Sequence, residues 1–161
     1  MDGAAALPKV SVQREDFDLG AEQARLAGTS RDIGAIVSFT GLVREITGQG
    51  AIDSMELEHW PGRTEKALAE IVAEAEARWP LDGVCVIHRY GRLAPGDRIV
   101  LVLTASRHRQ AAFDAAAFLM DYLKTDAPFW KKETGPEGGR WVDARDTDET
   151  AAARWRTASE G

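Results

Sequence analysis

The chain has 161 residues, with 20 Lys and Arg against 26 Asp and Glu, a formal net charge of −6 and one cysteine. That length suits one domain, and we expect a single domain over residues 1–161. A lone Cys85 excludes an intramolecular disulfide and a cysteine-based metal cage, and three widely spaced histidines make a metal site unexpected. The acidic average disfavours bulk binding of nucleic acid or anionic membranes. No apolar run approaches the ~20 residues of a membrane span, and residues 1–9 lack the features of a signal peptide. We therefore expect a soluble, cytoplasmic protein.

The first half of the chain is expected to alternate strands and helices. Apolar spacing predicts a strand at residues 10–12, a helix over 17–27, a buried strand over 33–40, a turn at 48–50, a strand over 54–59 and a helix over 64–79. In the last helix, Thr64 is positioned to cap the N-terminus, and Pro80 ends the helix. His59 shares the inward face of its strand with Met55 and Leu57, so we interpret it as a core histidine.

The second half continues the alternation. We predict strands over 84–90 and 98–105 joined by a turn at 95–97, a helix over 110–124, a loop at 135–139, a short strand at 141–142 and a terminal helix over about 146–156. Cys85 and His88 lie in the first of these strands, and we interpret both as buried core residues. The segment from about residue 144 onward is expected to be mobile. Strand pairs interleaved with helices favour an α+β fold over a doubly wound parallel sheet.

The helix over 110–124 ends on a lysine where an apolar stripe continues. Phe113, Ala116, Ala117 and Met120 share one face, and Lys124 lies about 40° from Met120 around the helix axis. A lysine there either extends its ammonium group into water or is partly desolvated. Desolvation would lower its pKa and suit it to acid–base or nucleophilic chemistry. The helix alone leaves both alternatives open and favours the solvated one.

Other cationic residues lie where predicted elements end. Arg44 follows the first buried strand, and His108 and Arg109 lie where a strand passes into a helix, a place where free N–H groups can bind an anion. Lys131 and Lys132 follow an aromatic segment that could form an apolar wall. Residues 105–133 hold five Lys and Arg against four Asp and Glu, so this stretch carries +1 and the remainder −7. The net charge therefore averages an acidic body with a few cationic residues at element ends.

Several motifs, taken together, resemble one family. They are Phe39–Arg44 (FTGLVR), Leu57–Gly62 (LEHWPG), Ile87–Gly91 (IHRYG), Ser106–Arg109 (SRHR) and Asp121–Glu133 (DYLKTDAPFWKKE). From about Ile33 to Trp155 the chain resembles the large, catalytic subunit of molybdopterin synthase. The resemblance implies an α+β fold, an α/β hammerhead-like domain with an additional small antiparallel β subdomain.

The activity that this resemblance implies is sulfur transfer. The family converts cyclic pyranopterin monophosphate into molybdopterin by building its dithiolene. Sulfur arrives as a thiocarboxylate at the C-terminal Gly-Gly of a small ubiquitin-like partner, whose tail threads into a pocket of the large subunit. Two such partners flank a homodimer of large subunits, which gives a heterotetramer. No cofactor or metal is implied, since the partner supplies the sulfur.

The same resemblance implies functional residues. The catalytic lysine corresponds to Lys124 and the second active-site lysine to Lys131. The substrate-binding positions correspond, besides these two lysines, to Leu42, Val43, Arg44, His108, Arg109, Lys132 and Glu133. Leu42 stands where many relatives carry a basic residue, so a charge contact from that position is absent. Arg107 is a further variation with no predicted effect.

Two other classes of function compete with a sulfurtransferase. A non-enzymatic α+β module with a basic pocket for a phosphorylated ligand or a partner's acidic tail would explain Arg44, Arg109 and Lys131 equally well. It gives no reason for Lys124 on an apolar stripe. Binding of single-stranded nucleic acid through Trp130 and the lysines is disfavoured by the charge of −6 and by the absence of a basic stripe. We therefore expect an enzyme that binds neither nucleic acid nor membranes.

Overall fold

The computed structural model describes residues 9–47, 50–51, 53–125, 127–136, 138–142 and 155. Its strands are β1 (Val10–Gln13), β2 (Ala35–Leu42), β3 (Ile46–Thr47), β4 (Gly50–Ala51), β5 (Ser54–His59), β6 (Leu81–Arg89), β7 (Gly91–Leu93), β8 (Arg98–Ser106), β9 (Phe129–Gly135) and β10 (Gly138–Val142). Its helices are α1 (Leu19–Ala27), α2 (Arg63–Arg78) and α3 (Arg109–Thr125). In these parts of the chain no helix is long and apolar enough to cross a membrane.

Two four-stranded sheets organise the fold. The first has the strand order β1–β6–β8–β2, and the second has the order β10–β9–β5–β7; β3 and β4 form a separate pair. In the first sheet only β1 and β6 run parallel, and in the second every described pairing is antiparallel. The predicted α+β class and the additional small antiparallel sheet are therefore confirmed.

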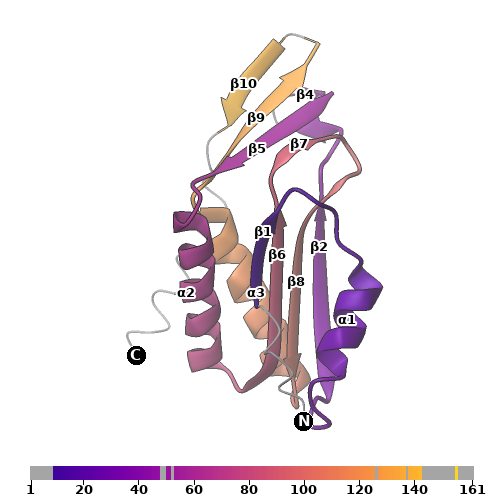
Figure 1. Ribbon diagram of the computed structural model, residues 1–161, viewed down its shortest axis with the longest axis vertical. Helices are drawn as coiled ribbons and strands as arrows, with labels where there is room; N and C mark the ends of the chain where they lie inside the picture. The colour runs from indigo at the N-terminus through magenta and orange to yellow at the C-terminus, as the bar shows by residue number, and fades with distance from the viewer. Residues whose placement is uncertain are drawn as a thin grey trace.

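The central strands β6 and β8 are covered on both faces. Helices α2 and α3 pack on one face of the first sheet and α1 packs on the other (Figure 1). Val84, Val86 and Val102 belong to the cluster under α2 and α3, whereas the alternate residues Cys85 and Leu103 belong to the cluster under α1. Double coverage explains why these strands are almost continuously apolar in sequence.

The second sheet sits at the end of the first sheet where β2 and β6 finish (Figure 1). The chain enters it from β6 through Gly91, whose φ of +93° suits glycine. It enters again from α3 through a short link that ends at Phe129, the first residue of β9. Both β7 and β9 pair with β5. Neither β7 nor β9 was predicted. Strand β7 is only three residues long, and the charged and polar residues of β9 do not show the apolar pattern of a strand.

Thr64 does not cap α2, contrary to the prediction. The cap is Gly62, with a φ of +85°, and its N–H donates to the Glu65 carboxylate at 2.7 Å. Thr64 is buried in the first turn, where its hydroxyl donates to the Trp60 carbonyl at 2.9 Å and accepts from the Trp60 N–H at 3.1 Å. One hydroxyl has one hydrogen, so His59 Nδ1, 3.0 Å away, donates to it. Thr64 therefore ties β5 to α2.

Two predicted features fall partly or wholly outside the described residues. The turn at 48–50 includes residues 48 and 49, and only Gly50 is described, as the start of β4. The terminal helix over about 146–156 and the mobile segment from about 144 lie outside the described residues, apart from Trp155, which is helical.

Two buried histidines connect the sheets. The His88 ring, near the end of β6, stacks on the Phe129 ring of β9 with centroids 3.9 Å apart and an interplanar angle of 19°. His59, from β5, lies 6.1 Å from Phe129 in a tilted arrangement. The ring of Phe129 is therefore near one histidine from each sheet. The interpretation of both histidines as core residues is confirmed.

The burial of His88 predicts a pH-dependent stability. Burial, assisted by the nearby Lys124 ammonium group, lowers the pKa of His88 from 6.5 to about 4, against a hydrogen bond to the Arg89 carbonyl that raises it. Between these pH values the unfolded chain binds a proton at this ring and the folded chain does not. The free energy of unfolding should therefore fall as the pH falls. We expect wild type to lose about 2 kcal/mol more than a His88→Phe variant between pH 7 and pH 4.5.

Urea denaturation at the two pH values measures this difference. Ile87→Ala is the matched control, because Ile87 is buried on the same strand and has no ionisable group. It should reduce stability by a similar amount at both pH values. Equal losses for wild type and His88→Phe between pH 7 and pH 4.5 would contradict the prediction.

Candidate functional site

The strand directions bring several predicted site residues to one end of the first sheet. Both β2 and β6 pair antiparallel with β8, so they finish together where β8 begins, with Leu42 opposite Arg98. Helix α3 follows β8 and runs back to the same end (Figure 1). Arg44, two residues beyond β2, and Lys124, in the last turn of α3, therefore lie at the junction of the two sheets. The positive charge of Lys124 acts on the buried His88 there.

Alternation along β9 divides its side chains between two faces. Phe129 faces the first sheet, since its ring stacks on the buried histidine of β6. Lys131 and Glu133 share this inner face, and Glu133 is buried at 3% exposure. Trp130 and Lys132 lie on the opposite, outer face. The predicted binding segment is therefore split, with Lys131 and Glu133 toward the junction and Lys132 away from it.

Lys132 extends over the neighbouring strand. Its backbone pairs with Glu56 on one side and with Trp141 on the other. A Cβ atom added to Gly139 of β10 would lie 2.6 Å from Lys132 Cε, so the lysine chain crosses this glycine. The structure does not bring Lys132 together with Lys124 and Lys131.

Lys124 belongs to the outer stripe of α3. Ala116 is buried, whereas Phe113 is 58% exposed, Ala117 and Met120 are partly covered, and Lys124 is exposed. The sequence grouped Ala116 with this stripe, but the helix turns Ala116 toward the core. The partial desolvation of Lys124 considered from the sequence is therefore not found in the single chain.

The segment after β2 has a buried centre and exposed flanks. Val43 is buried, its N–H donates to the Asp97 carbonyl at 2.9 Å, and its own carbonyl accepts from the Gly96 N–H at 2.8 Å. These bonds fix the segment against the turn before β8. Leu42, at 55% exposure, and Arg44 then face outward. Val43 thus holds its two neighbours in place at the end of β2.

His108 and Arg109 lie at the opposite end of α3 from Lys124. Arg109 begins the helix and Lys124 is in its last turn, a separation of about 22 Å at 1.5 Å per residue. Both His108 and Arg109 are exposed. One chain therefore does not bring this pair together with the two lysines.

The start of α3 is held by hydrogen bonds and ion pairs. The His108 N–H donates to the Ser106 hydroxyl at 3.1 Å, and that hydroxyl donates to the Pro80 carbonyl at 2.8 Å. The Arg107 guanidinium is 3.5 Å from the Asp32 carboxylate and 3.8 Å from that of Asp82. Arg107 thus faces carboxylates, whereas His108 and Arg109 are exposed at the start of the helix.

Cys85 is a buried core residue, as predicted. It lies in the cluster under α1, on the face of β6 opposite to His88. Burial raises the pKa of its thiol to about 11, so the reactive thiolate is scarce at neutral pH. This supports a structural role for the only cysteine.

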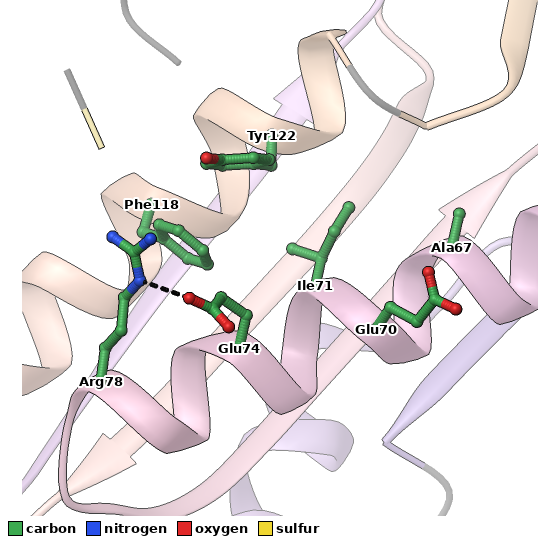
Figure 2. A pocket seen from close by; sticks show the side chains of 7 residues that line it. All are labelled: Ala67, Glu70, Ile71, Glu74, Arg78, Phe118 and Tyr122. Carbon is green, nitrogen blue, oxygen red and sulfur yellow. Dashed lines mark hydrogen bonds and ion pairs between the residues drawn. The ribbon is translucent and has the colours of Figure 1, made fainter. Parts of the chain in front are cut away.

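A cavity of about 340 Å³ lies between α2 and α3, and none of the predicted site residues lines it. Its lining residues are Ala67, Glu70, Ile71, Glu74, Arg78, Phe118 and Tyr122 (Figure 2). Arg78 bonds to Glu74 at 2.9 Å and donates to the carbonyl of Trp155 at 3.0 Å. The indole N–H of Trp155 donates to Asp121 at 2.6 Å. These contacts anchor the one described residue of the C-terminal segment.

Sequence reasoning missed the contact between His88 and Phe129. Its signal was present in the period of two along β6, which puts His88 on the same face as Val84 and Val86, under α2 and α3. The partner ring could not be inferred, because β9 was not predicted. Within the described ranges, no group of three or more His, Cys, Asp or Glu side chains is close enough together to hold a metal ion.

Comparison with known proteins identifies the family. The family model described as MoaE protein matches residues 12–126. A molybdopterin synthase catalytic subunit from Mesorhizobium japonicum is 56% identical over 160 residues, which cover 98% of this chain and 99% of that protein.

Solved structures agree with this relationship. A molybdopterin biosynthesis MoaE protein from Burkholderia ambifaria has a TM-score of 0.80 and 54% identity, over 92% of this chain and 98% of that one. A protein from Helicobacter pylori was solved as a complex of subunits 1 and 2 of molybdopterin-converting factor. It shares the fold, with a TM-score of 0.71 and 17% identity, over 86% of this chain and 92% of that one. Because a family model covers most of the chain and a relative more than half identical covers nearly all of it, the chain belongs to the MoaE family of molybdopterin synthase catalytic subunits.

Proposed function

We propose that this chain transfers sulfur from the thiocarboxylated C-terminus of a small ubiquitin-like subunit to cyclic pyranopterin monophosphate, which forms the dithiolene of molybdopterin. The observation that carries the proposal is that Lys124, Lys131 and Arg44 lie on segments that meet at the junction of the two sheets. The thiocarboxylate and the phosphate are both anions, so cationic donors suit both. The complex of two subunits described for the Helicobacter pylori protein supports a second subunit as the sulfur donor.

The two lysines suit different parts of the reaction. Each transfer replaces a carbon–oxygen bond of the substrate by a carbon–sulfur bond, and the displaced oxygen leaves as water or stays on the phosphate when the cyclic ester opens. Water then cleaves the acyl carbon–sulfur bond, which leaves a carboxylate on the partner. Lys131, on the inner face of β9, is proposed to orient the thiocarboxylate. Lys124, which is exposed in the single chain, is proposed to stabilise the charge that develops during transfer. An inserted partner tail would exclude water from Lys124 and strengthen this effect.

No cofactor is required by this chemistry, since the partner brings the sulfur. Cys85 need not carry sulfur, because it is buried on the other side of the first sheet. For the cellular location we propose the cytoplasm, which suits a chain whose only cysteine is free.

We propose further that two copies of the chain share each site. His108 and Arg109 cannot hold the same atoms of a substrate as Lys124 of their own chain, given the length of α3. Two α3 helices packed antiparallel about a twofold axis would bring His108 and Arg109 of one copy to Lys124 of the other. The stripe between these ends is apolar, with Phe113 58% exposed, and Phe39 on the neighbouring edge strand β2 is 40% exposed. Such a homodimer with two small subunits is a heterotetramer.

Replacement of Lys124 tests the enzymatic proposal. We expect Lys124→Ala to lower the rate of dithiolene formation by ~10²–10³-fold, because one preorganised charge at the reacting atoms is lost. The assay combines the purified chain, thiocarboxylated partner and pyranopterin precursor. Lys66→Ala, at an exposed position on α2, is the matched control and should react at the wild-type rate. A folded, partner-bound Lys124→Ala at the wild-type rate would refute the assignment. Absence of product with wild type would refute the enzyme and favour a binding module.

Mixed dimers test whether the site is shared. Lys124→Ala and Arg109→Ala are each expected to be poorly active as homodimers. Co-expression of the two should restore about a quarter of wild-type activity, since half of the dimers are mixed and each has one intact site. An activity no greater than the mean of the two variants would contradict a shared site and leave both functions within one chain.

The proposed dimer face has its own test. Phe113→Asp buries a charge in that face, so we expect a single-copy mass in light scattering at micromolar concentration and little activity. Ala73→Asp, at an exposed position on α2, is the control and should remain dimeric. A dimeric Phe113→Asp would show that two copies meet elsewhere.

A further inference from the structure

Two aromatic residues of the stretch between Lys124 and Lys131 make ring contacts: Phe129 packs on His88, and Trp130 meets Trp60 with centroids 6.2 Å apart. Of these two contacts, only that of Phe129 reaches the first sheet. Lys124 is in the last turn of α3 and Lys131 is the third residue of β9, so seven residue steps separate them. The Phe129 N–H donates to the Ala127 carbonyl at 2.8 Å, which tightens the link as it enters β9. The Phe129 ring then packs on His88 at 3.9 Å. The ring of Phe129 therefore joins the stretch between the two lysines to the first sheet.

Two neighbouring strands and one hydrogen bond fix the position of His88. It is 9% exposed and lies in register with Val12 of β1 and Val100 of β8. Its Nδ1 is 2.9 Å from the Arg89 carbonyl, and because a carbonyl only accepts, Nδ1 carries the hydrogen in this contact. The bond sets the rotation of the ring, and with it the plane against which Phe129 stacks. A leucine would fill a similar volume but would define no such plane.

We propose that His88 is a positioning residue for sulfur transfer, which fixes Lys131 relative to Lys124 by clamping Phe129. The inference rests on the proposed function, since it assigns His88 to that same site. His88 touches neither substrate nor partner in this role and acts only through the stacked ring. The lowered pKa keeps the imidazole neutral, so that no further positive charge lies beside Lys124.

A kinetic test separates positioning from general stability. We expect His88→Leu to lower kcat about 10-fold or more with a change in partner KM below about 3-fold, since a misplaced charge weakens the transition state rather than binding. His88→Phe, which keeps a planar ring, should recover most of the rate. Ile87→Ala is the matched control, because it removes buried volume from the same strand on the opposite face. It should leave kcat within about 2-fold of wild type.

A double-mutant cycle tests the route through Phe129. If His88 acts only through this ring, Phe129→Leu and the double variant His88→Leu/Phe129→Leu should have the same kcat as His88→Leu alone. Independent, multiplicative losses would overturn the inference, as would equal kcat values for His88→Leu and Ile87→Ala.

A readout without activity keeps the inference separate from the proposed function. A short amine-reactive bifunctional reagent should link Lys124 to Lys131 in wild type, and mass spectrometry measures the yield. We expect His88→Leu and Phe129→Leu to lower that yield at least 3-fold and Ile87→Ala to leave it unchanged. Equal yields in wild type and His88→Leu overturn the positioning role, even where wild type makes product. If the two variants give lowered cross-link yields but wild type makes no product, the positioning role of His88 is supported and the sulfurtransferase proposal is refuted.

Discussion

The double burial of β6 and β8 is the constraint on which the rest of the structure depends. Strands covered on both faces must send alternate side chains into two separate clusters, one under α2 and α3 and one under α1. This alternation decides the environment of every residue on β6. It puts the thiol of Cys85 among apolar groups on one side and the imidazole of His88 on the other, at the strand end that meets the second sheet. The packing of the whole sheet thus determines which polar group of β6 reaches the junction of the two sheets.

The same geometry places candidate site residues at two separate ends of α3. Its start carries His108 and Arg109, and its last turn carries Lys124, with a rigid helix of about 22 Å between them. A helix packed on a sheet cannot bend to bring its ends together. The length of α3 therefore acts as a spacer, and any chemistry that uses both ends depends on a second copy supplying one of them. The uncovered stripe with Phe113 lies between these ends, where such a copy would pack.

The long, strongly apolar elements could be predicted from the sequence, and the elements that depend on distant partners could not. The periodicity of α2 and α3 and the apolar runs of β6 and β8 are local signals, and their predicted limits lie within a few residues of those observed. By contrast, β9 reads as aromatic and charged, and it is a strand because Lys131 pairs with Leu57 far away in the chain. Thr64 matched the local pattern of a cap, but the N-cap of α2 is Gly62, which has a positive φ. The hydroxyl of Thr64 instead bonds to His59. The site residues were predicted as a set, whereas their division between two ends and two faces follows from tertiary structure.

The alternation of β9 has a consequence for how this site tolerates change. The inward and outward faces of a strand exchange whenever its register shifts by one residue. In most strands such a shift would remove the functional group from its site altogether. Here Lys131 and Lys132 are adjacent, so a single-residue deletion in the link after α3 would place Lys132 at the inward position of Lys131. The buried position of Glu133 would then pass to Thr134, so the two registers would keep the cation and differ in the acid beside it. The paired lysines thus make the charge of the site robust to a shift in this direction, while its carboxylate still specifies one register.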